Sequence, residues 1–232
     1  MQAVILVAGM GNRLKNATGG KPKCMVDVSG KSIAERQIDN LLSVGVDRIL
    51  AVTGYKNDVL KNFLHTKYPV LDFVQNERFA DTNTIYSLYL AFQKLQDDFF
   101  FLNGDVVFGA NILKNLVDFS GTGLAVEFKP CCEEEVKVML KGSRITAISK
   151  QVPLHQASGE FTGIALFRKG MHAAFYESLK FEIEAGNVKA YFERALDRIA
   201  DQVELQAMDI TGEAFVEVDF PEDLERARKL PL

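Results

Sequence analysis

The sequence predicts an α/β protein built as one domain on a doubly wound, mostly parallel, Rossmann-like sheet. In the first half of the chain, short apolar runs alternate with segments whose apolar residues recur every three to four positions. This alternation is typical of right-handed βαβ units. The second half carries shorter strand patterns. These predict a small antiparallel subregion that could cover a ligand.

The strands expected in the first half are short, continuous apolar runs, as buried strands are. They are Ala3–Ala8, Arg48–Thr53, Val70–Val74 and Asp98–Leu102. The helices between them follow the 3.6-residue period. The first begins at a capping box of Ser32 and Glu35 and ends at Gly45, the second is a short helix over Val59–Leu64, and the third is Thr84–Leu95.

The elements expected in the second half begin with three short strands and a hairpin turn at Lys141-Gly142. The strands are Leu124–Lys129, Glu135–Leu140 and Arg144–Ser149, followed by a buried strand, Phe161–Phe167. Then come helices Met171–Ala185 and Val188–Ala200, strands Val203–Met208 and Phe215–Val218, and helix Pro221–Lys229. No linker or repeat interrupts this order, so we expect a single domain over residues 1–232.

Composition limits the classes of partner. The 232 residues are 47% apolar and 25% charged, ordinary values for a globular protein. A net charge of −4 gives no general attraction to nucleic acid or to an anionic membrane. The apolar runs are too short to span a bilayer, and no signal-peptide pattern precedes the first strand, so we expect a cytoplasmic protein. The three cysteines and three histidines lack the spacing of a zinc site or a disulfide framework. The sequence leaves the oligomeric state open, a homo-oligomer included.

A loop rich in glycine and cations follows the first strand, in the segment LVAGMGNRLKNATGGKPKCM at 6–25. It is neither a P-loop nor a GxGxxG motif, because Arg13 stands near the place of a third glycine. Ligands of open α/β sheets bind beyond the carboxyl ends of the strands. The loop, the segment Asn103–Asp105 and Asp219 are therefore expected on one rim. Glycines that permit close backbone approach, beside the cations Arg13, Lys15, Lys21 and Lys23, predict an anion site.

The loop and its continuation, ending VDVSGKSI at residue 33, resemble the signature of the nucleoside-triphosphate transferase family: L-A-A-G-x-G-x-R-L-x-P-L-T-x-x-x-P-K-x-L, then G-K. Ten residues separate Arg13 from Lys23, as in that family. The segments NGDV at 103–106 and VEVDFPEDLERA at 216–227 resemble its metal-binding motif and its closing segment. The departures remove no charged group; they are Val7 for alanine, Asn16 and Ala17 for Pro-Leu, and Met25 for leucine.

Two further segments, NERFADTNTIYSLYLA at 76–91 and GEFTGIALF at 159–167, resemble the cytidylyltransferases that act on phosphocholine, inositol phosphate and aminoethylphosphonate. The resemblance implies a CTP-dependent enzyme that couples CMP to the phosphate or phosphonate of a small acceptor (a phosphorylated alcohol, polyol or amino compound) and releases pyrophosphate. Such enzymes often serve cell-surface polymer or phosphonate pathways. Two alternatives remain: a sugar-1-phosphate uridylyl-, thymidylyl- or guanylyltransferase, and a non-catalytic nucleotide-binding regulatory subunit.

The resemblance also implies roles for individual residues. Arg13 and Lys23 would stabilise the phosphates during catalysis, and Asp105 and Asp219 would hold Mg²⁺. The residues expected at the nucleotide are Val7, Ala8, Gly9, Gly11, Asn12, Asn83, Ser87 and Gly104. Lys150 and Glu160, within an acceptor-binding subregion of about 124–168, would contact the acceptor. Glu217 is expected on the opposite face of its strand and is left out of the metal set.

Purely structural roles remain as alternatives for several of these residues. Asn83 would equally serve as an ordinary helix cap, and Lys150 as a surface lysine. The chain has no Trp, the strongest face for a quaternary ammonium, which argues against choline. Three other aromatic residues could take the place of Trp at such a ligand or could belong to the core: Phe161, Tyr191 and Phe192. The acidic run Glu133–Glu135 could bind an amine group of the acceptor or could be a solvated surface segment.

Overall fold

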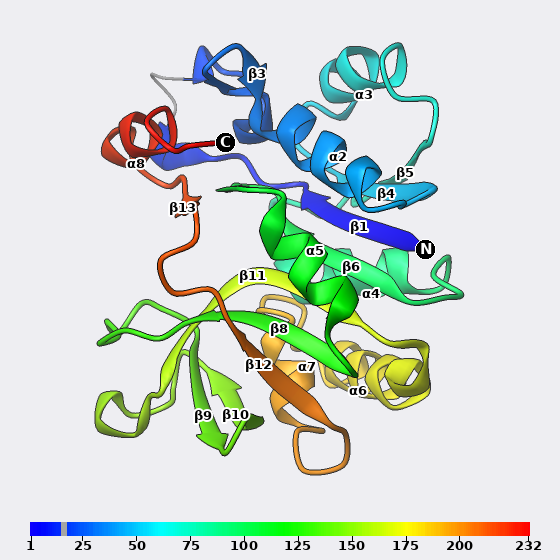
Figure 1. The fold of residues 1–232 in the computed structure, drawn as a ribbon. Coiled ribbons are helices and arrows are strands. Elements are labelled where there is room, and N and C mark those ends of the chain that lie inside the picture. The colour runs from blue at the N-terminus through cyan, green and yellow to red at the C-terminus, as the bar shows by residue number, and fades with distance from the viewer. Residues whose placement is uncertain (15–17) are drawn as a thin grey trace.

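A computed structural model describes residues 1–14 and 18–232, and its centre is a nine-stranded sheet (Figure 1). The strand order is β5-β4-β1-β6-β11-β8-β12-β10-β9. In chain order, these strands are β1 (Gln2–Val7), β4 (Arg48–Thr53), β5 (Leu71–Gln75), β6 (Phe99–Asn103), β8 (Thr122–Glu127), β9 (Lys137–Lys141), β10 (Arg144–Ser149), β11 (Gly159–Phe167) and β12 (Leu205–Asp209). Two small ladders join β2 (Asp27–Val28) to β3 (Lys31–Ser32) and β7 (Val106–Phe108) to β13 (Phe215–Glu217).

The expected α/β class is correct, but the sheet is parallel only in part. Strands β5, β4, β1 and β6 are mutually parallel, and so are β12 and β8. The pairings of β11 with β6 and β8, and of β10 with β9 and β12, are antiparallel. A parallel connection needs a crossover of a dozen or more residues, usually a helix. The connections from β8 to β11 are shorter and hold only the 3₁₀ turn η3 (Leu154–Gln156).

Helices cover both faces of the sheet (Figure 1). One face packs against α2 (Ile33–Ser43), α3 (Asn57–His65) and α5 (Asn111–Asp118), and the other against α4 (Thr84–Phe92), α6 (His172–Glu184) and α7 (Glu193–Asp197). A third apolar cluster joins α8 (Pro221–Ala227) to the loops after β1. The remaining 3₁₀ turns are η1 (Asn12–Leu14), η2 (Lys23–Met25) and η4 (Lys169–Met171). None of the helices in the described ranges has the length and apolar character of a membrane span.

Local signals in the sequence set several boundaries. The capping box of Ser32 and Glu35 is confirmed at the start of α2. The turn at Lys141-Gly142 is confirmed between β9 and β10, where Gly142 has φ +63°. Loop residues Lys15, Asn16 and Ala17 lie outside the described residues.

The helix expected over residues 188–200 is wrong in its first part, because α7 begins only at Glu193. Gly186, at φ +83°, follows the end of α6. The carbonyl of Val188 then accepts a hydrogen bond from the Asn83 amide at 3.0 Å, and the Phe192 amide donates to the Thr84 hydroxyl at 3.0 Å. These bonds tie the segment to the start of α4, and the Ala190 amide donates to the Asn187 carbonyl at 3.0 Å, so the segment forms a turn beside the cleft instead of a helix.

Candidate active site

A cleft of about 940 Å³ opens at the carboxyl ends of β1 and β6. Leu6 and Asn103 are partners in the parallel register, so the loop after β1 starts beside Gly104. The Gly104 amide donates to the Leu6 carbonyl at 3.0 Å, and a Cβ at position 104 would lie 2.4 Å from that oxygen. Only glycine permits this approach, so Gly104 brings the two loops together.

The glycine loop supports the stem of Lys23. Gly11 has φ +61°, and a Cβ built on it would lie 2.7 Å from the Lys23 Cβ. Leu14, at the end of η1, is buried in the cluster that α8 closes. Gly11 and this anchor together position η2, from which Lys23 enters the cleft.

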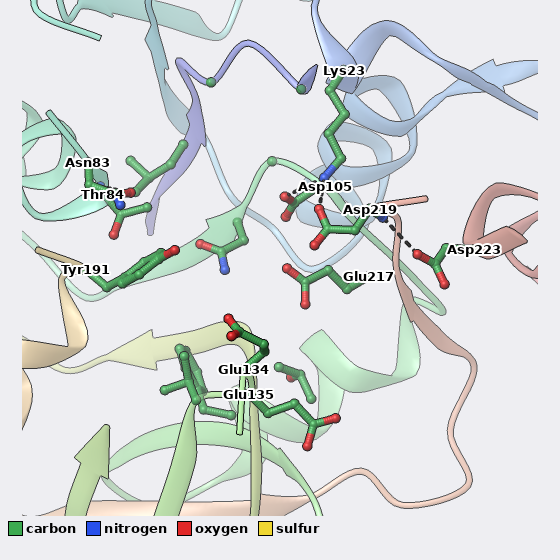
Figure 2. Close-up of a pocket in the computed structure, with 18 of the residues that line it drawn as sticks. Lys23, Asn83, Thr84, Asp105, Glu134, Glu135, Tyr191, Glu217, Asp219 and Asp223 are labelled. Atoms are coloured by element: carbon green, nitrogen blue, oxygen red, sulfur yellow. Dashed lines mark hydrogen bonds and ion pairs between the residues drawn. The ribbon is translucent and has the colours of Figure 1, made fainter. Parts of the chain in front are cut away.

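A short ladder brings together two carboxylates that are far apart in the sequence. Val106 of β7 pairs with Glu217 of β13, and the Val218 amide donates to the Asp105 carbonyl at 2.9 Å. The side chains of Asp105 and Asp219 therefore meet at the end of the ladder (Figure 2). This explains how residues from opposite halves of the chain share one site.

The Lys23 ammonium bridges these two carboxylates. Its Nζ lies 2.9 Å from Oδ2 of Asp105 and 2.6 Å from Oδ1 of Asp219 (Figure 2). The Nη1 of Arg13 lies 2.9 Å from Oδ2 of Asp219, and the guanidinium lies 5.2 Å from the ring centroid of Phe220. Both cations predicted to bind phosphate thus reach the cleft and are paired with carboxylates.

Glu217 corrects one expectation. Ligand oxygens of Asp105, Glu217 and Asp219 lie within 4.8 Å of one another, so Glu217 belongs to the acidic cluster. Side chains two positions apart on a strand share a face. Glu217 and Asp219 therefore flank Val218, which is buried in the core. The alternation was visible in the sequence, and assigning Glu217 to the opposite face was wrong.

Charge coupling in the cluster shifts two pKa values. Burial opposes the charge on Lys23, but Asp105 and Asp219 outweigh it, so the pKa of Lys23 is raised. The pKa of Glu217 is raised to about 8 by desolvation between the cleft walls and by the charges of Asp105 and Asp219. The Glu217 side chain still reaches the solvent of the cleft.

The acidic cluster fits a hard divalent cation. One oxygen, Oδ1 of Asp105, is buried and has no hydrogen-bond partner within the described ranges. Buried carboxylate oxygens normally have partners. Three convergent carboxylates supply the oxygen ligands that such ions prefer.

The residues predicted for the nucleotide surround the other half of the cleft. Apart from Asn12, all of them line it: Val7, Ala8, Gly9, Gly11, Asn83, Ser87 and Gly104. The Asn12 side chain lies outside the described parts of the chain. The side chain of Asn83 caps α4 by accepting from the Thr84 amide at 2.8 Å. The capping alternative therefore describes the side chain of Asn83.

Asn76, which is absent from the residues expected at the nucleotide, fixes this wall. Asn76 directly follows β5 and is 1% exposed. Its Nδ2 donates to the hydroxyls of Thr82 and Ser87, at 3.0 Å each. The Ser87 hydroxyl is thereby held at the cleft by a buried network. The signal for Asn76 was its place at the carboxyl end of a predicted strand.

The opposite wall contains a cluster of carboxylates around Lys129. The Lys129 Nζ lies 2.9 Å from Glu127, 3.2 Å from Glu135 and 2.7 Å from Glu160. Desolvation raises the pKa of Glu160 despite the adjacent Lys129. Glu160 lines the cleft as predicted, with one oxygen already paired to Lys129.

The aromatic candidates separate clearly. Phe161 and Phe192 are buried in the core, and Phe192 packs against Phe101 with ring centroids 4.2 Å apart. Tyr191 is 44% exposed and projects into the cleft (Figure 2). The Lys150 Nζ lies 4.7 Å from its ring centroid, so Lys150 reaches the cleft as well.

With this geometry in place, comparison with known proteins decides the family. Residues 3–175 match the profile of the MobA-like NTP transferase domain. The chain belongs to this family.

Relatives of this MobA-like transferase match between half and nearly all of its length. A CTP:phosphoglutamine cytidylyltransferase from Campylobacter jejuni is 28% identical over 250 residues, which cover 97% of this chain and 98% of that protein. A choline-phosphate cytidylyltransferase from Streptococcus pneumoniae is 36% identical over 115 residues, 50% of this chain and 49% of its own. A solved structure of CTP:phosphocholine cytidylyltransferase from Streptococcus pneumoniae has a TM-score of 0.85 at 23% identity, with 98% and 97% of the two chains covered. These two chains share a fold.

Proposed function

We propose that this MobA-like transferase is a CTP-dependent cytidylyltransferase that transfers CMP to the phosphate or phosphonate of a small acceptor and releases pyrophosphate. The observation that carries the proposal is the convergence of Arg13 and Lys23 with Asp105 and Asp219 beside the glycine loop. The choice of CTP is supported by the cytidylyltransferases that match this chain. We propose that residues 1–232 act as one domain.

In the proposed reaction an oxygen of the acceptor phosphate attacks the α-phosphorus of CTP. The new O–P bond forms as the bond from the α-phosphorus to the bridging oxygen breaks, and that electron pair leaves with pyrophosphate. An ionised phosphate needs no general base, so catalysis rests on alignment and electrostatics. Lys23 would stabilise charge at the α-phosphate, and Arg13 would bind the β- and γ-phosphates through its planar fork.

The carboxylates that would hold Mg²⁺ are Asp105, Glu217 and Asp219. When bound, the ion would supply positive charge that orients the triphosphate and stabilises its developing negative charge. Lys23 and Arg13 currently neutralise two of these carboxylates. In the loaded site both side chains would be released toward the phosphates.

Nucleotide and acceptor would occupy opposite halves of the cleft. The backbone of residues 7–12 and Gly104, with Asn83 and Ser87, would contact CTP. Val7 and Ala8 have buried side chains, so they would contribute through their backbone. Lys150 and Glu160, in the subregion of about 124–168, would contact the acceptor. No step in this scheme needs nucleic acid or a membrane, and we propose a cytoplasmic enzyme.

The test is pyrophosphate release from each nucleoside triphosphate with Mg²⁺ and a panel of phosphorylated acceptors. Release with CTP and a small phosphate or phosphonate, but not with a sugar 1-phosphate, would support the proposal. Release with UTP, dTTP or GTP and a sugar phosphate would establish a sugar-nucleotide enzyme instead. If CTP binds and no pair is turned over, a regulatory nucleotide-binding subunit is the better description. Chelation of divalent ions should abolish any release.

A further inference from the structure

The acceptor half of the cleft contains an aromatic face with a cation over it. The ring of Tyr191 has the Lys150 ammonium 4.7 Å from its centroid. Figure 2 shows Tyr191 entering the pocket on the side away from Asp219 and above Glu134. A cation over an aromatic face is the geometry in which proteins bind ammonium ligands. Here a side chain of the protein itself supplies the cation.

A buried carboxylate lies beside this arrangement without a full set of partners. Glu193 lines the cleft and is 4% exposed, and its Oε2 makes no hydrogen bond to any described part of the chain. Burial raises the pKa of Glu193 to about 7, and the charge of Lys150 acts in the opposite direction. A buried acid that lacks a donor is costly unless something pairs with it. Its position in the cleft makes a ligand the natural partner.

Lys150 is held more loosely than the other lysine of this wall. Its ion-pair partner among the described residues is Glu134, whose carboxylate oxygen lies 3.8 Å away and whose side chain is 97% exposed. Lys129, in contrast, reaches three carboxylates at 3.2 Å or less. A contact of 3.8 Å is longer than a hydrogen bond. A ligand of like charge could therefore displace Lys150 at small cost.

Resting on the proposed cytidylyl transfer, we propose that Tyr191, Glu193 and Glu134 form a subsite for a positively charged nitrogen on the acceptor, which Lys150 occupies until the acceptor displaces it. The acceptor is therefore zwitterionic: phosphate or phosphonate at one end and an ammonium group at the other. A displaced Lys150 is free to turn to the acceptor phosphate, which agrees with the contact to the acceptor that the family resemblance implies for it. An uncharged polyol would leave Glu193 without a counter-charge.

The first test needs neither CTP nor turnover, and it removes the internal cation. In Lys150→Ala, calorimetry should show choline chloride, a quaternary ammonium without phosphate, binding at least tenfold more tightly than to the wild type. Ethanolamine hydrochloride tests a primary ammonium in the same way. The matched control is Lys189→Ala, an exposed lysine that lies two residues before Tyr191 and does not line the cleft, and this variant should bind like the wild type. Unchanged or weaker binding of both cations by Lys150→Ala would overturn the proposal.

Two further variants test whether the tighter cation binding of Lys150→Ala takes place at the proposed subsite. In the Lys150→Ala background, Tyr191→Leu and Glu193→Gln should each return the affinity for the better-bound cation to the wild-type value or below. Tyr191 is partly exposed, so its variant is expected to fold even if the buried Glu193→Gln does not. A gain that survives Tyr191→Leu would show that the cation binds elsewhere and would overturn the assignment.

The second test uses neutral isosteres of the acceptor with the wild-type enzyme. Phosphocholine should bind at least tenfold more tightly than 3,3-dimethylbutyl phosphate, or phosphoethanolamine more tightly than 2-hydroxyethyl phosphate. A difference within the phosphocholine pair would assign a quaternary ammonium to the subsite, and a difference within the phosphoethanolamine pair would assign a primary ammonium. Equal binding within both pairs would overturn the proposal. Pyrophosphate release with CTP is measured separately. If cations are preferred but no pyrophosphate appears, the proposed function fails while the ammonium subsite stands.

Discussion

The two walls of the cleft use their lysines differently. On the wall of the glycine loop, Lys23 and Arg13 face the three carboxylates Asp105, Glu217 and Asp219, and Lys23 is bonded to two of them. On the opposite wall, which we propose binds the acceptor (the acceptor wall), Lys129 is surrounded by three glutamates, whereas Lys150 lies over the ring of Tyr191 with one carboxylate, Glu134, at 3.8 Å. The first wall resembles a metal site whose place is taken by the Lys23 ammonium. The second resembles a site for an ammonium ligand whose place is taken by the Lys150 ammonium.

The difference bears on which groups each wall would exchange in the proposed reaction cycle. Lys23 makes two short ion pairs, at 2.9 and 2.6 Å, so in the proposed function its replacement calls for a doubly charged ion and a triphosphate that attracts the lysine. The loose position of Lys150 suits replacement by a singly charged group. The strength of each internal contact thus matches the charge of the species proposed to replace it.

The largest effect is expected at the glycine-loop wall. Lys23→Ala should lower kcat with saturating CTP and Mg²⁺ by roughly 10²- to 10³-fold, the cost typical of one removed electrostatic donor. Steady-state pyrophosphate release measures this loss. Lys114→Ala, an exposed lysine on α5 away from the cleft, is the control and should keep the wild-type rate. A Lys23→Ala rate within threefold of wild type would contradict the electrostatic role.

A second prediction concerns the buried acid of the acceptor wall. Because folding raises the pKa of Glu193 to about 7, the folded chain holds this proton more tightly than the unfolded chain. The resulting stability is complete below the ordinary carboxyl pKa and is lost as the pH rises toward 7, to a total of about 3 kcal/mol. Urea unfolding at pH 4.5 to 8 should therefore give a steeper decline for wild type than for Glu193→Gln.

The control for this pH profile is Glu177→Gln, an exposed glutamate on α6. Its free energy of unfolding should follow the wild-type curve. Parallel curves for wild type and Glu193→Gln would show that Glu193 titrates normally, and the acceptor wall would then hold an ordinary carboxylate.

A pair of glycines tests how the first wall supports its lysine. Gly11→Ala forces a left-handed backbone on alanine and a contact with the Lys23 stem, whereas a Cβ at Gly9 has nothing within 4 Å. Gly11→Ala should cost about 1–3 kcal/mol of stability, or a Tm lower by about 2–12 °C for a chain of this size. Gly9→Ala should change Tm far less. Equal thermal shifts for the two variants would remove the argument for steric support.

The smallest effect is expected at the third carboxylate. Glu217→Gln should raise the Mg²⁺ concentration for half-maximal rate about tenfold, near the low end of effects seen for residues around metal sites. Glu213→Gln, exposed and outside the cleft, is the matched control. A Mg²⁺ titration identical to that of the wild type would show that Glu217 is not a ligand and that Asp105 and Asp219 alone hold the ion.

Local patterns in the sequence predicted most of the fold. The capping box, the hairpin turn and the strands of the first half follow from propensity and period, which act over a few residues. The antiparallel pairing of β11 and the non-helical turn segment before α7 depend on contacts between distant parts of the chain, such as Val188 with Asn83. Nothing local in the sequence encodes those contacts.

The residues of the candidate site likewise fall into those that the sequence predicts and those that only the structure reveals. The long motif of the glycine loop predicts Arg13 and Lys23, and two separate short segments, at 103–106 and 216–227, predict Asp105 and Asp219. Strand alternation predicts Glu217 on the same face as Asp219, two positions away, so its place in the cluster is within reach of the sequence. Glu193 could not be predicted, because its interest lies in a missing hydrogen-bond partner that only the packed structure reveals.

The ladder between β7 and β13 has a consequence for how the protein comes into being. Lys23 and Asp219 are 196 positions apart, so the carboxylate cluster forms only after nearly all of the chain has been synthesised. Contacts of such long sequence separation form slowly. A nascent chain would carry its glycine loop for most of its synthesis without an assembled metal site, and would become competent for nucleotide chemistry in one of its last folding steps.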